Sequence, residues 1–335
     1  MNIAEEIRAN VKSDMSAISY LVADKLEKTE TLFAEMLRSR IGIISTIGKH
    51  IANSGGKRIR PLVHLLSAGM CGHKGERDIL FASIFESIHT ATLIHDDIID
   101  NAHTRRGRVT VNRKWGNSIT VLIGDYLFTK SVFNALHDGN LKIIHRIAEI
   151  TMKMIEGELM QEDSIGKIDL TEEEYIEIAR RKTACLFSGC TSIAGIISDA
   201  SDQEVKALEQ FGMNFGIAFQ LIDDLLDLTS DEKVLGKPAA SDLKEGRLTL
   251  PLIYLLQIGI LKHRKLITSI LGGHDGEDSL KDVIKIVGEN GVIKRARDRA
   301  FYFAEKAKIY LEAFPHSDYR DALINLTDLI INRDR

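Results

Sequence analysis

Long stretches without proline constrain the fold of this 335-residue chain more than any other feature. Only four prolines occur, Pro61, Pro238, Pro251 and Pro315, and each lies where a helix would begin or a loop would run. Elsewhere apolar residues recur at spacings of three and four, as on one face of a helix. The ranges with this pattern are 3–50, 62–72, 79–100, 117–137, 141–162, 172–198, 202–228, 249–271 and 278–332. Because no convincing strand alternation appears, we predict an all-α bundle, with residues 1–335 forming a single domain.

Charge and composition exclude several classes of protein. The net charge of −4 gives no case for nucleic-acid binding. Three cysteines, Cys71, Cys185 and Cys190, lack paired spacing and are expected to be reduced thiols. The first residues contain acids and no apolar run, and no segment reaches the length of a membrane span. We therefore expect a cytoplasmic protein.

Two aspartate clusters of the same form carry the strongest chemical signal. They are Asp96-Asp97-Ile98-Ile99-Asp100 and Asp223-Asp224-Leu225-Leu226-Asp227, each at the end of a helical pattern. On a helix, residues four apart share a face, so Asp96 stacks on Asp100 and Asp223 on Asp227 as like charges. Carboxylate oxygens suit Mg²⁺, which is usually held by a few carboxylates together with substrate phosphates. The pair of clusters predicts a magnesium-dependent polyphosphate site.

A solvated helix face is the simpler explanation for one such cluster. Two copies favour a site, because apolar residues expected in the core precede each of them and ionised groups near a core need partners or a metal. Those residues are Ile84, Phe85, Ile88 and Leu93 before the first cluster, and Phe215, Ile217, Phe219 and Leu221 before the second.

Basic residues gather in loops close to these clusters. In Gly55-Gly56-Lys57-Arg58-Ile59-Arg60-Pro61, glycines and a helix start favour close approach of an anion, although an ordinary basic loop would look the same. Arg105 and Arg106 follow the first cluster and could hold phosphates or neutralise the aspartates. The run 231–251 and Arg180-Arg181-Lys182-Thr183 are weaker candidates for phosphate contacts.

Together these residues resemble the trans-polyprenyl diphosphate synthases of the isoprenoid synthase family. The motifs are GGKRIRP at 55–61, IHTATLIHDDIIDNAHTRRG at 88–107, RKTA at 181–184, FQLIDDLLD at 219–227 and GKPAASDLKEGRLTLP at 236–251. The resemblance implies an all-α, farnesyl diphosphate synthase-like helical bundle around a central cavity, usually a homodimer, with magnesium between the aspartate motifs. Ala240 and Arg247 depart from a frequent glycine and lysine, which leaves loop detail open.

The resemblance also assigns roles by motif. Magnesium ligands would be Asp96 and Asp100 with Asp97 in support, and Asp223 with Asp224 and Asp227. Isopentenyl diphosphate would contact Lys57, Arg60, His89 and Arg106. The allylic diphosphate, with farnesyl diphosphate the expected primer, would contact Arg105, Lys182, Thr183, Gln220 and Lys237. Ionisation of the allylic substrate would give a carbocation that the isopentenyl double bond attacks.

The resemblance links product length to residues one helical turn before the first aspartate. The resemblance implies that bulky aromatic side chains there stop elongation, whereas Ala91 and Thr92 are small. We therefore predict a long-chain product near octaprenyl, with heptaprenyl to decaprenyl open, serving as a quinone side-chain precursor. Such a lipid-like product is compatible with contact at a membrane surface, although no anchor is visible.

Other functions remain open at this point. A shorter-chain synthase or a class I terpene cyclase would share the bundle, but a cyclase has no second diphosphate to occupy GGKRIRP. A non-catalytic subunit would be expected to lose one aspartate cluster. A di-iron bundle needs two ExxH pairs, and only Glu86 with His89 forms one. If the chain were a purely structural helical protein, the presence of paired acidic and basic clusters would be a coincidence.

Overall fold

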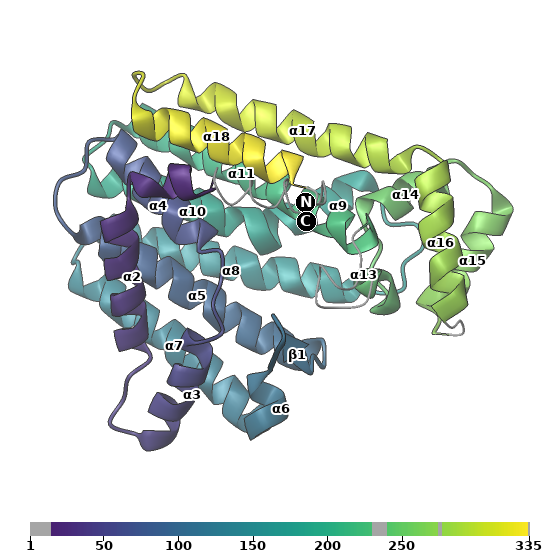
Figure 1. Ribbon diagram of the computed structural model, residues 1–335, viewed down its shortest axis with the longest axis horizontal. Coiled ribbons are helices and arrows are strands. Elements are labelled where there is room, and N and C mark those ends of the chain that lie inside the picture. The colour runs from purple at the N-terminus through teal and green to yellow at the C-terminus, as the bar shows by residue number, and fades with distance from the viewer. Residues whose placement is uncertain (1–14, 230–239, 274–276, 334–335) are drawn as a thin grey trace, which may run out of the picture. The chain divides into compact units, whose positions relative to one another are not determined.

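The computed structural model describes residues 15–229, 240–273 and 277–333. The chain divides into two compact units. Unit 1 comprises residues 1–149, 189–209 and 313–325, and unit 2 comprises residues 150–188, 210–312 and 326–335. Figure 1 shows that helices account for nearly all of the regular structure, so the all-α prediction is confirmed.

The long helix α5 (Arg77–Ile99) organises unit 1. It contacts α2 (Ala23–Met36), α4 (Ile59–Met70), α6 (Val111–Trp115) and α7 (Asn117–His137), as can be followed in Figure 1. Helix α3 (Gly42–Ala52) packs on α2. Because α5 has neighbours on several sides, even its polar residues Ser83, Glu86 and Ser87 are buried. The first aspartate cluster thus extends from a helix embedded in the core.

A short hairpin follows α5 and contains the only strands in the described ranges. Strands β1 (Thr104–Arg105) and β2 (Arg108–Val109) are antiparallel, with Thr104 opposite Val109 and Arg105 opposite Arg108. The two turn residues, Arg106 and Gly107, both have positive φ, 52° and 72°. Right-handed strand twist favours such mirror-image turns in two-residue loops. The hairpin lies between α5 and α6.

Unit 2 has its own apolar core around α14. Helix α14 (Leu250–Gln257) begins with Pro251 in its first turn and contacts α9 (Glu172–Ala179), α15 (Leu261–Leu271), α16 (Glu277–Glu289) and α17 (Val292–Leu311). Residues of α14 are almost all buried, including Leu252 and Tyr254. Short helix α13 (Ser241–Lys244) packs on α15.

The remaining helical segments contribute residues to both units. They are α8 (Leu141–Asp163), α10 (Cys185–Ile197), α11 (Asp202–Thr229) and α18 (Asp318–Asn332). Between α9 and α10 lies one turn of π-helix, η1 (Arg180–Ala184). The capping box of Thr171 and Glu174 fixes the start of α9.

Several predicted helical ranges match the structure closely, and others divide. The ranges 117–137, 141–162 and 202–228 correspond to α7, α8 and α11. The range 249–271 breaks at Gly259, which has a φ of 80° that favours glycine, and 278–332 breaks at Gly291 with a φ of 70°. No helix among the described residues is long and apolar enough to cross a membrane.

Candidate active site

The first aspartate cluster lies at the C-terminal end of α5. Asp97 is buried, and the Nε of Arg105 donates a 2.7 Å hydrogen bond to its Oδ1. Burial raises the pKa of Asp97, while the charge of Arg105 opposes that shift. Asp96 and Asp100 are half-buried. The carboxylate of Asp97 therefore holds the hairpin arginine, and the supporting role at a metal that was assigned to Asp97 stays a prediction.

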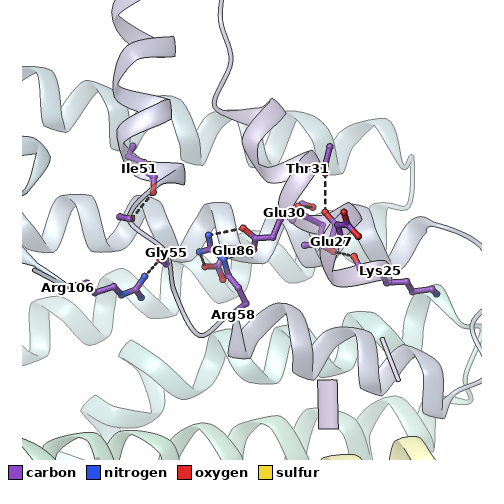
Figure 2. Close-up of polar contacts among 12 residues, drawn as sticks. Lys25, Glu27, Glu30, Thr31, Ile51, Gly55, Arg58, Glu86 and Arg106 are labelled. Carbon is purple, nitrogen blue, oxygen red and sulfur yellow. Dashed lines mark hydrogen bonds and ion pairs between the residues drawn. The ribbon is translucent and has the colours of Figure 1, made fainter. Parts of the chain in front are cut away.

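The hairpin and the loop before α4 meet through an arginine. Arg106 donates from Nη1 to the carbonyl oxygen of Gly55, as Figure 2 shows. Arg105 and Arg106, which are adjacent in sequence, thus contact different partners, one an aspartate and the other the glycine loop.

His89 lies among the arginines of unit 1. Burial lowers the pKa of His89 well below its ordinary value, and the positive charges of Arg60, Arg106, Arg105 and Arg58 lower it further. The imidazole is therefore neutral near pH 7. A cavity of about 60 Å³ next to these residues is lined by Arg58, Arg105, Arg106 and Arg108 together with Glu86 and Asp97. Such a concentration of guanidinium groups favours an anion.

Ala91 and Thr92 occupy different environments on α5. Ala91 is buried in an apolar cluster with Phe33, Leu37 and Ile94 among its members. Thr92 is half-buried, and its hydroxyl donates a 2.8 Å hydrogen bond to the carbonyl oxygen of His89. A larger side chain at Ala91 would have to displace that cluster, whereas position 92 is less confined.

The second aspartate cluster lies on α11 within unit 2. Asp224 accepts hydrogen bonds from the Tyr175 hydroxyl at 2.5 Å and from the Gln220 amide at 2.6 Å. Burial raises the pKa of Asp224 to about 6, although both hydrogen bonds oppose the shift. Asp223 pairs with Arg333, whose guanidinium also lies 4.5 Å from the centre of the Phe219 ring.

Asp227 differs from its neighbours because it is buried and contacts backbone. Its Oδ2 accepts a 3.1 Å hydrogen bond from the amide of Asp242, at the start of α13. Its own carbonyl oxygen accepts one of 2.9 Å from the amide of Ala240. Asp227 therefore fixes the backbone that follows the second cluster.

The π-helical turn η1 brings the predicted allylic-site residues of unit 2 together. The Thr183 hydroxyl donates a 2.6 Å hydrogen bond to Oε1 of Gln220, so Thr183, Gln220, Asp224 and Tyr175 form one chain of hydrogen bonds. Lys182 pairs with Glu158 at 2.7 Å. Lys237, the remaining predicted contact, lies outside the described residues.

The acidic residues fit a metal that is shared with a ligand. Within the described ranges, no group of three or more His, Cys, Asp or Glu side chains is placed to hold a metal ion alone. Asp96, Asp100 and Asp223 nevertheless offer the hard oxygen donors that Mg²⁺ prefers, and that ion usually completes its shell with water and substrate phosphates.

Sequence reasoning missed several residues that shape the site. Glu30 and Glu86 pair with Arg58, Tyr175 binds Asp224, Glu158 pairs with Lys182, and Arg333 pairs with Asp223. The two partners in each of these pairs are 24 or more positions apart. Only Glu86 carried a sequence signal, as half of an ExxH pair, and the structure assigns its carboxylate to Arg58 instead.

Helices that present carboxylates beside clustered arginines suit an enzyme that acts on diphosphate esters. Comparison with known proteins shows the class of this enzyme: the chain is a prenyltransferase. More particularly, it belongs to the Polyprenyl synthetase family, whose model matches residues 42–287.

Individual relatives cover nearly the whole chain. The octaprenyl diphosphate synthase of Escherichia coli (strain K12) is 35% identical over 322 residues, which are 96% of this chain and 100% of that protein. A short chain isoprenyl diphosphate synthase of Methanothermobacter thermautotrophicus is also 35% identical over 322 residues, 93% of this chain and 99% of that protein. Overall identity therefore does not separate long from short products.

A solved structure supports the fold directly. The polyprenyl synthase of Caulobacter crescentus CB15, complexed with calcium and isoprenyl diphosphate, superposes with a TM-score of 0.92 at 30% identity. The match covers 96% of this chain and 98% of that one. The recognition of the family from its motifs is confirmed.

Proposed function

We propose that this enzyme condenses isopentenyl diphosphate with an allylic prenyl diphosphate, head to tail and trans, to give a long-chain polyprenyl diphosphate near octaprenyl that serves as a quinone side-chain precursor. The observation that carries the proposal is the group of arginines around His89, which lies on the helix that leads into Asp96 and Asp100. An anion site next to paired carboxylates suits a substrate diphosphate and its metal.

Each substrate has its own set of contacts. Lys57, Arg60, His89 and Arg106 bind isopentenyl diphosphate, and neutral His89 donates an N–H without adding a charge. Arg105, Lys182, Thr183, Gln220 and Lys237 bind the allylic diphosphate. The short hydrogen bond from Thr183 to Gln220 supports this assignment, because it orders two of these groups before the substrate arrives.

Asp96, Asp97 and Asp100 in unit 1 and Asp223, Asp224 and Asp227 in unit 2 would serve magnesium. Asp96, Asp100 and Asp223 would be the direct ligands, with Asp97, Asp224 and Asp227 in support. When bound, Mg²⁺ neutralises negative charge on the departing diphosphate.

The residues of the chain act by binding, orienting and excluding water. Arg105, Lys182 and Lys237 stabilise the diphosphate as the allylic C–O bond breaks and its electron pair leaves with oxygen. Lys57, Arg60 and Arg106 hold the diphosphate group of isopentenyl diphosphate. The double bond of this substrate then forms the new C–C bond. A proton leaves the resulting cation to the released diphosphate, and the product regains an allylic double bond. No side-chain nucleophile takes part.

Small side chains at Ala91 and Thr92 favour the long product. An aromatic residue at either position would project bulk from α5 one turn before Asp96, whereas alanine and threonine leave that turn narrow. Farnesyl diphosphate is the proposed primer.

Exposed apolar side chains support a homodimer. On α7, Leu122 is 66% exposed, Phe133 52% and Leu136 51%. Large apolar groups left in water favour association with a second surface. We place the dimer in the cytoplasm, with peripheral membrane contact for release of product.

Substitution of one residue from each set tests the proposed site. Lys57→Ala should raise the KM for isopentenyl diphosphate, and Asp96→Asn should lower kcat by about 100-fold or more, since it removes a charge used in the transition state. Exposed Lys49 and Asp24 provide matched controls, Lys49→Ala and Asp24→Asn. Full activity of Asp96→Asn, or activity that persists when a chelator removes Mg²⁺, would contradict the proposal.

A further inference from the structure

Arg58, the last residue of the loop before α4, has a backbone conformation that needs support. Its φ of 50° and ψ of 36° place it in the left-handed region at the N-cap of α4. A residue with a side chain occupies this region at a cost, so it persists only where the surroundings hold it. The side chain supplies that hold.

The Arg58 guanidinium joins the loop to two helices of unit 1. Its Nε and Nη2 donate to the two carboxylate oxygens of Glu30 on α2, at 2.5 and 3.0 Å. Its Nη1 donates to Glu86 on α5 at 2.6 Å. The Phe33 ring lies 5.2 Å below its Cζ. Figure 2 shows Arg58 between the two glutamates, and its side chain is only 14% exposed.

The pairing of Arg58 with Glu86 matters for an anion site, because Glu86 brings a negative charge close to it. Its side chain is 6% exposed and lines the same cavity as Arg105 and Arg106. An uncompensated carboxylate there would repel a diphosphate or pair with Arg106, whose charge already interacts with Glu86. The ion pair with Arg58 compensates the charge of Glu86.

Gly56 shows how closely the two arginines approach the loop. A Cβ atom at Gly56 would lie 2.7 Å from Nη1 of Arg106 and 3.1 Å from Nη1 of Arg58. Both guanidinium groups are already held, one by the Gly55 carbonyl and the other by the glutamates. The loop backbone is therefore enclosed by arginines from two directions.

We infer that Arg58 is a positioning residue for isopentenyl diphosphate: it anchors the loop that carries Lys57, and the start of the helix that carries Arg60, to Glu30 and Glu86, and it cancels the charge of Glu86. This rests on the proposed function of that loop. Three donors of Arg58 are committed to carboxylates, so its role is exercised through its neighbours.

Steady-state kinetics of the full-length enzyme with each substrate varied in turn tests the inference. Arg58→Met should raise the KM for isopentenyl diphosphate by about 10- to 100-fold, the scale of a displacement near 1 Å, and change the KM for the allylic substrate far less. Arg58→Lys retains the charge without the forked geometry, so its KM for isopentenyl diphosphate should lie between those of the unsubstituted enzyme and Arg58→Met. Exposed Arg38 gives the matched control, Arg38→Met.

A double substitution separates charge cancellation from direct substrate contact. Arg58→Met/Glu86→Gln removes the uncompensated carboxylate, so it should bind isopentenyl diphosphate more tightly than Arg58→Met alone. Glu30→Gln is the milder probe if Arg58→Met fails to fold, because Glu30 is 44% exposed, and it should raise the same KM modestly.

The results distinguish the inference from the function on which it rests. If Lys57→Ala leaves the KM for isopentenyl diphosphate unchanged, the proposed substrate site is wrong. If Lys57→Ala raises it while Arg58→Met and Glu30→Gln do not, only the role of Arg58 is overturned. If the double variant binds isopentenyl diphosphate no more tightly than Arg58→Met does, the inference that Arg58 cancels the charge of Glu86 is overturned.

Discussion

The hydroxyl of Tyr175 donates a 2.5 Å hydrogen bond to Oδ2 of Asp224, which joins α9 to the second aspartate cluster. The Gln220 amide occupies the other oxygen at 2.6 Å. Both oxygens of this carboxylate are thus oriented by the protein itself. Asp224 adjoins Asp223, a proposed metal ligand, and hydrogen bonds that order the surroundings of a ligand strengthen metal binding.

Removal of the Tyr175 hydroxyl should therefore impair catalysis more than folding. We expect Tyr175→Phe to lower kcat by about 10-fold and raise the Mg²⁺ concentration needed for half activity, as losses of outer hydrogen bonds do. Kinetics across a magnesium titration measure both. Tyr20, 80% exposed, provides the control Tyr20→Phe. An unchanged magnesium dependence would show that Tyr175 only packs.

Two glycines should be indispensable to the π-helical turn that carries Lys182 and Thr183. A Cβ at Gly157 would lie 2.4 Å from the Lys182 amide nitrogen, and one at Gly216 would lie 2.5 Å from the Cα of Ala184. Backbone cannot yield to such contacts, so Gly157→Ala and Gly216→Ala should each destabilise the protein by about 1–3 kcal/mol and lower activity.

Gly288 in α16 gives the matched control, since a Cβ there meets nothing within 4 Å. Gly288→Ala should be neutral or stabilise by about 0.5–1 kcal/mol, because alanine favours helix. Thermal unfolding of the three variants measures the contrast. Equal stability of all three would contradict the close packing at the turn.

Acid should destabilise the protein through His64. Its Nδ1 donates to the Cys190 carbonyl at 2.7 Å, and burial lowers the pKa of His64 to about 4 from 6.5. The unfolded chain therefore binds the proton first: the stability is complete above pH 6.5 and is lost as pH falls towards 4. The loss approaches about 3 kcal/mol, at 1.36 kcal/mol per pKa unit.

Urea unfolding between pH 7 and pH 4 measures this slope. His64→Gln should lower stability at pH 7 and flatten the slope, with a remainder from His73 and His89, whose pKa values are also lowered by burial. His316, 81% exposed on its side chain, provides the control His316→Gln. A slope that is the same in His64→Gln and in the unsubstituted protein would exclude His64 as the source.

A bulky side chain one helical turn before Asp96 should shorten the polyprenyl product. Ala91→Tyr is expected to shift products towards farnesyl and geranylgeranyl diphosphate, and because Ala91 is buried it should also destabilise by about 1–3 kcal/mol. Thr92→Phe, at a half-buried position, should shorten the product with a smaller loss. Chromatography of the dephosphorylated products gives the length, and a thermal midpoint controls for folding. Unchanged length in both variants would sink this assignment.

The sequence was sufficient to predict the all-α fold and several of the helices. The pattern over 117–137 coincides with α7, because proline-free amphipathic segments encode their own helicity. The resemblance had already set Asp97 apart from Asp96 as a supporting residue, and the structure adds its partner, Arg105 in the hairpin that follows.

Ion pairs between residues far apart in the chain could not be predicted from the sequence. Nothing local to Arg58 indicates Glu30 or Glu86 as its partners, since their approach depends on how α2 and α5 pack. The π-helical turn at Arg180–Ala184 was equally hidden, because its spacing continues the apolar pattern of 172–198 and its position is set by the close contact at Gly157.

One assay tests the central claim most directly: purified protein is incubated with labelled isopentenyl diphosphate, farnesyl diphosphate and Mg²⁺, and the dephosphorylated alcohols are sized. A ladder that ends near octaprenol, and that disappears when a chelator is added, is the predicted result. A ladder that stops at geranylgeraniol would contradict the long-chain assignment. Failure to extend either farnesyl or geranylgeranyl diphosphate would contradict the claim that this chain alone is a long-chain polyprenyl diphosphate synthase.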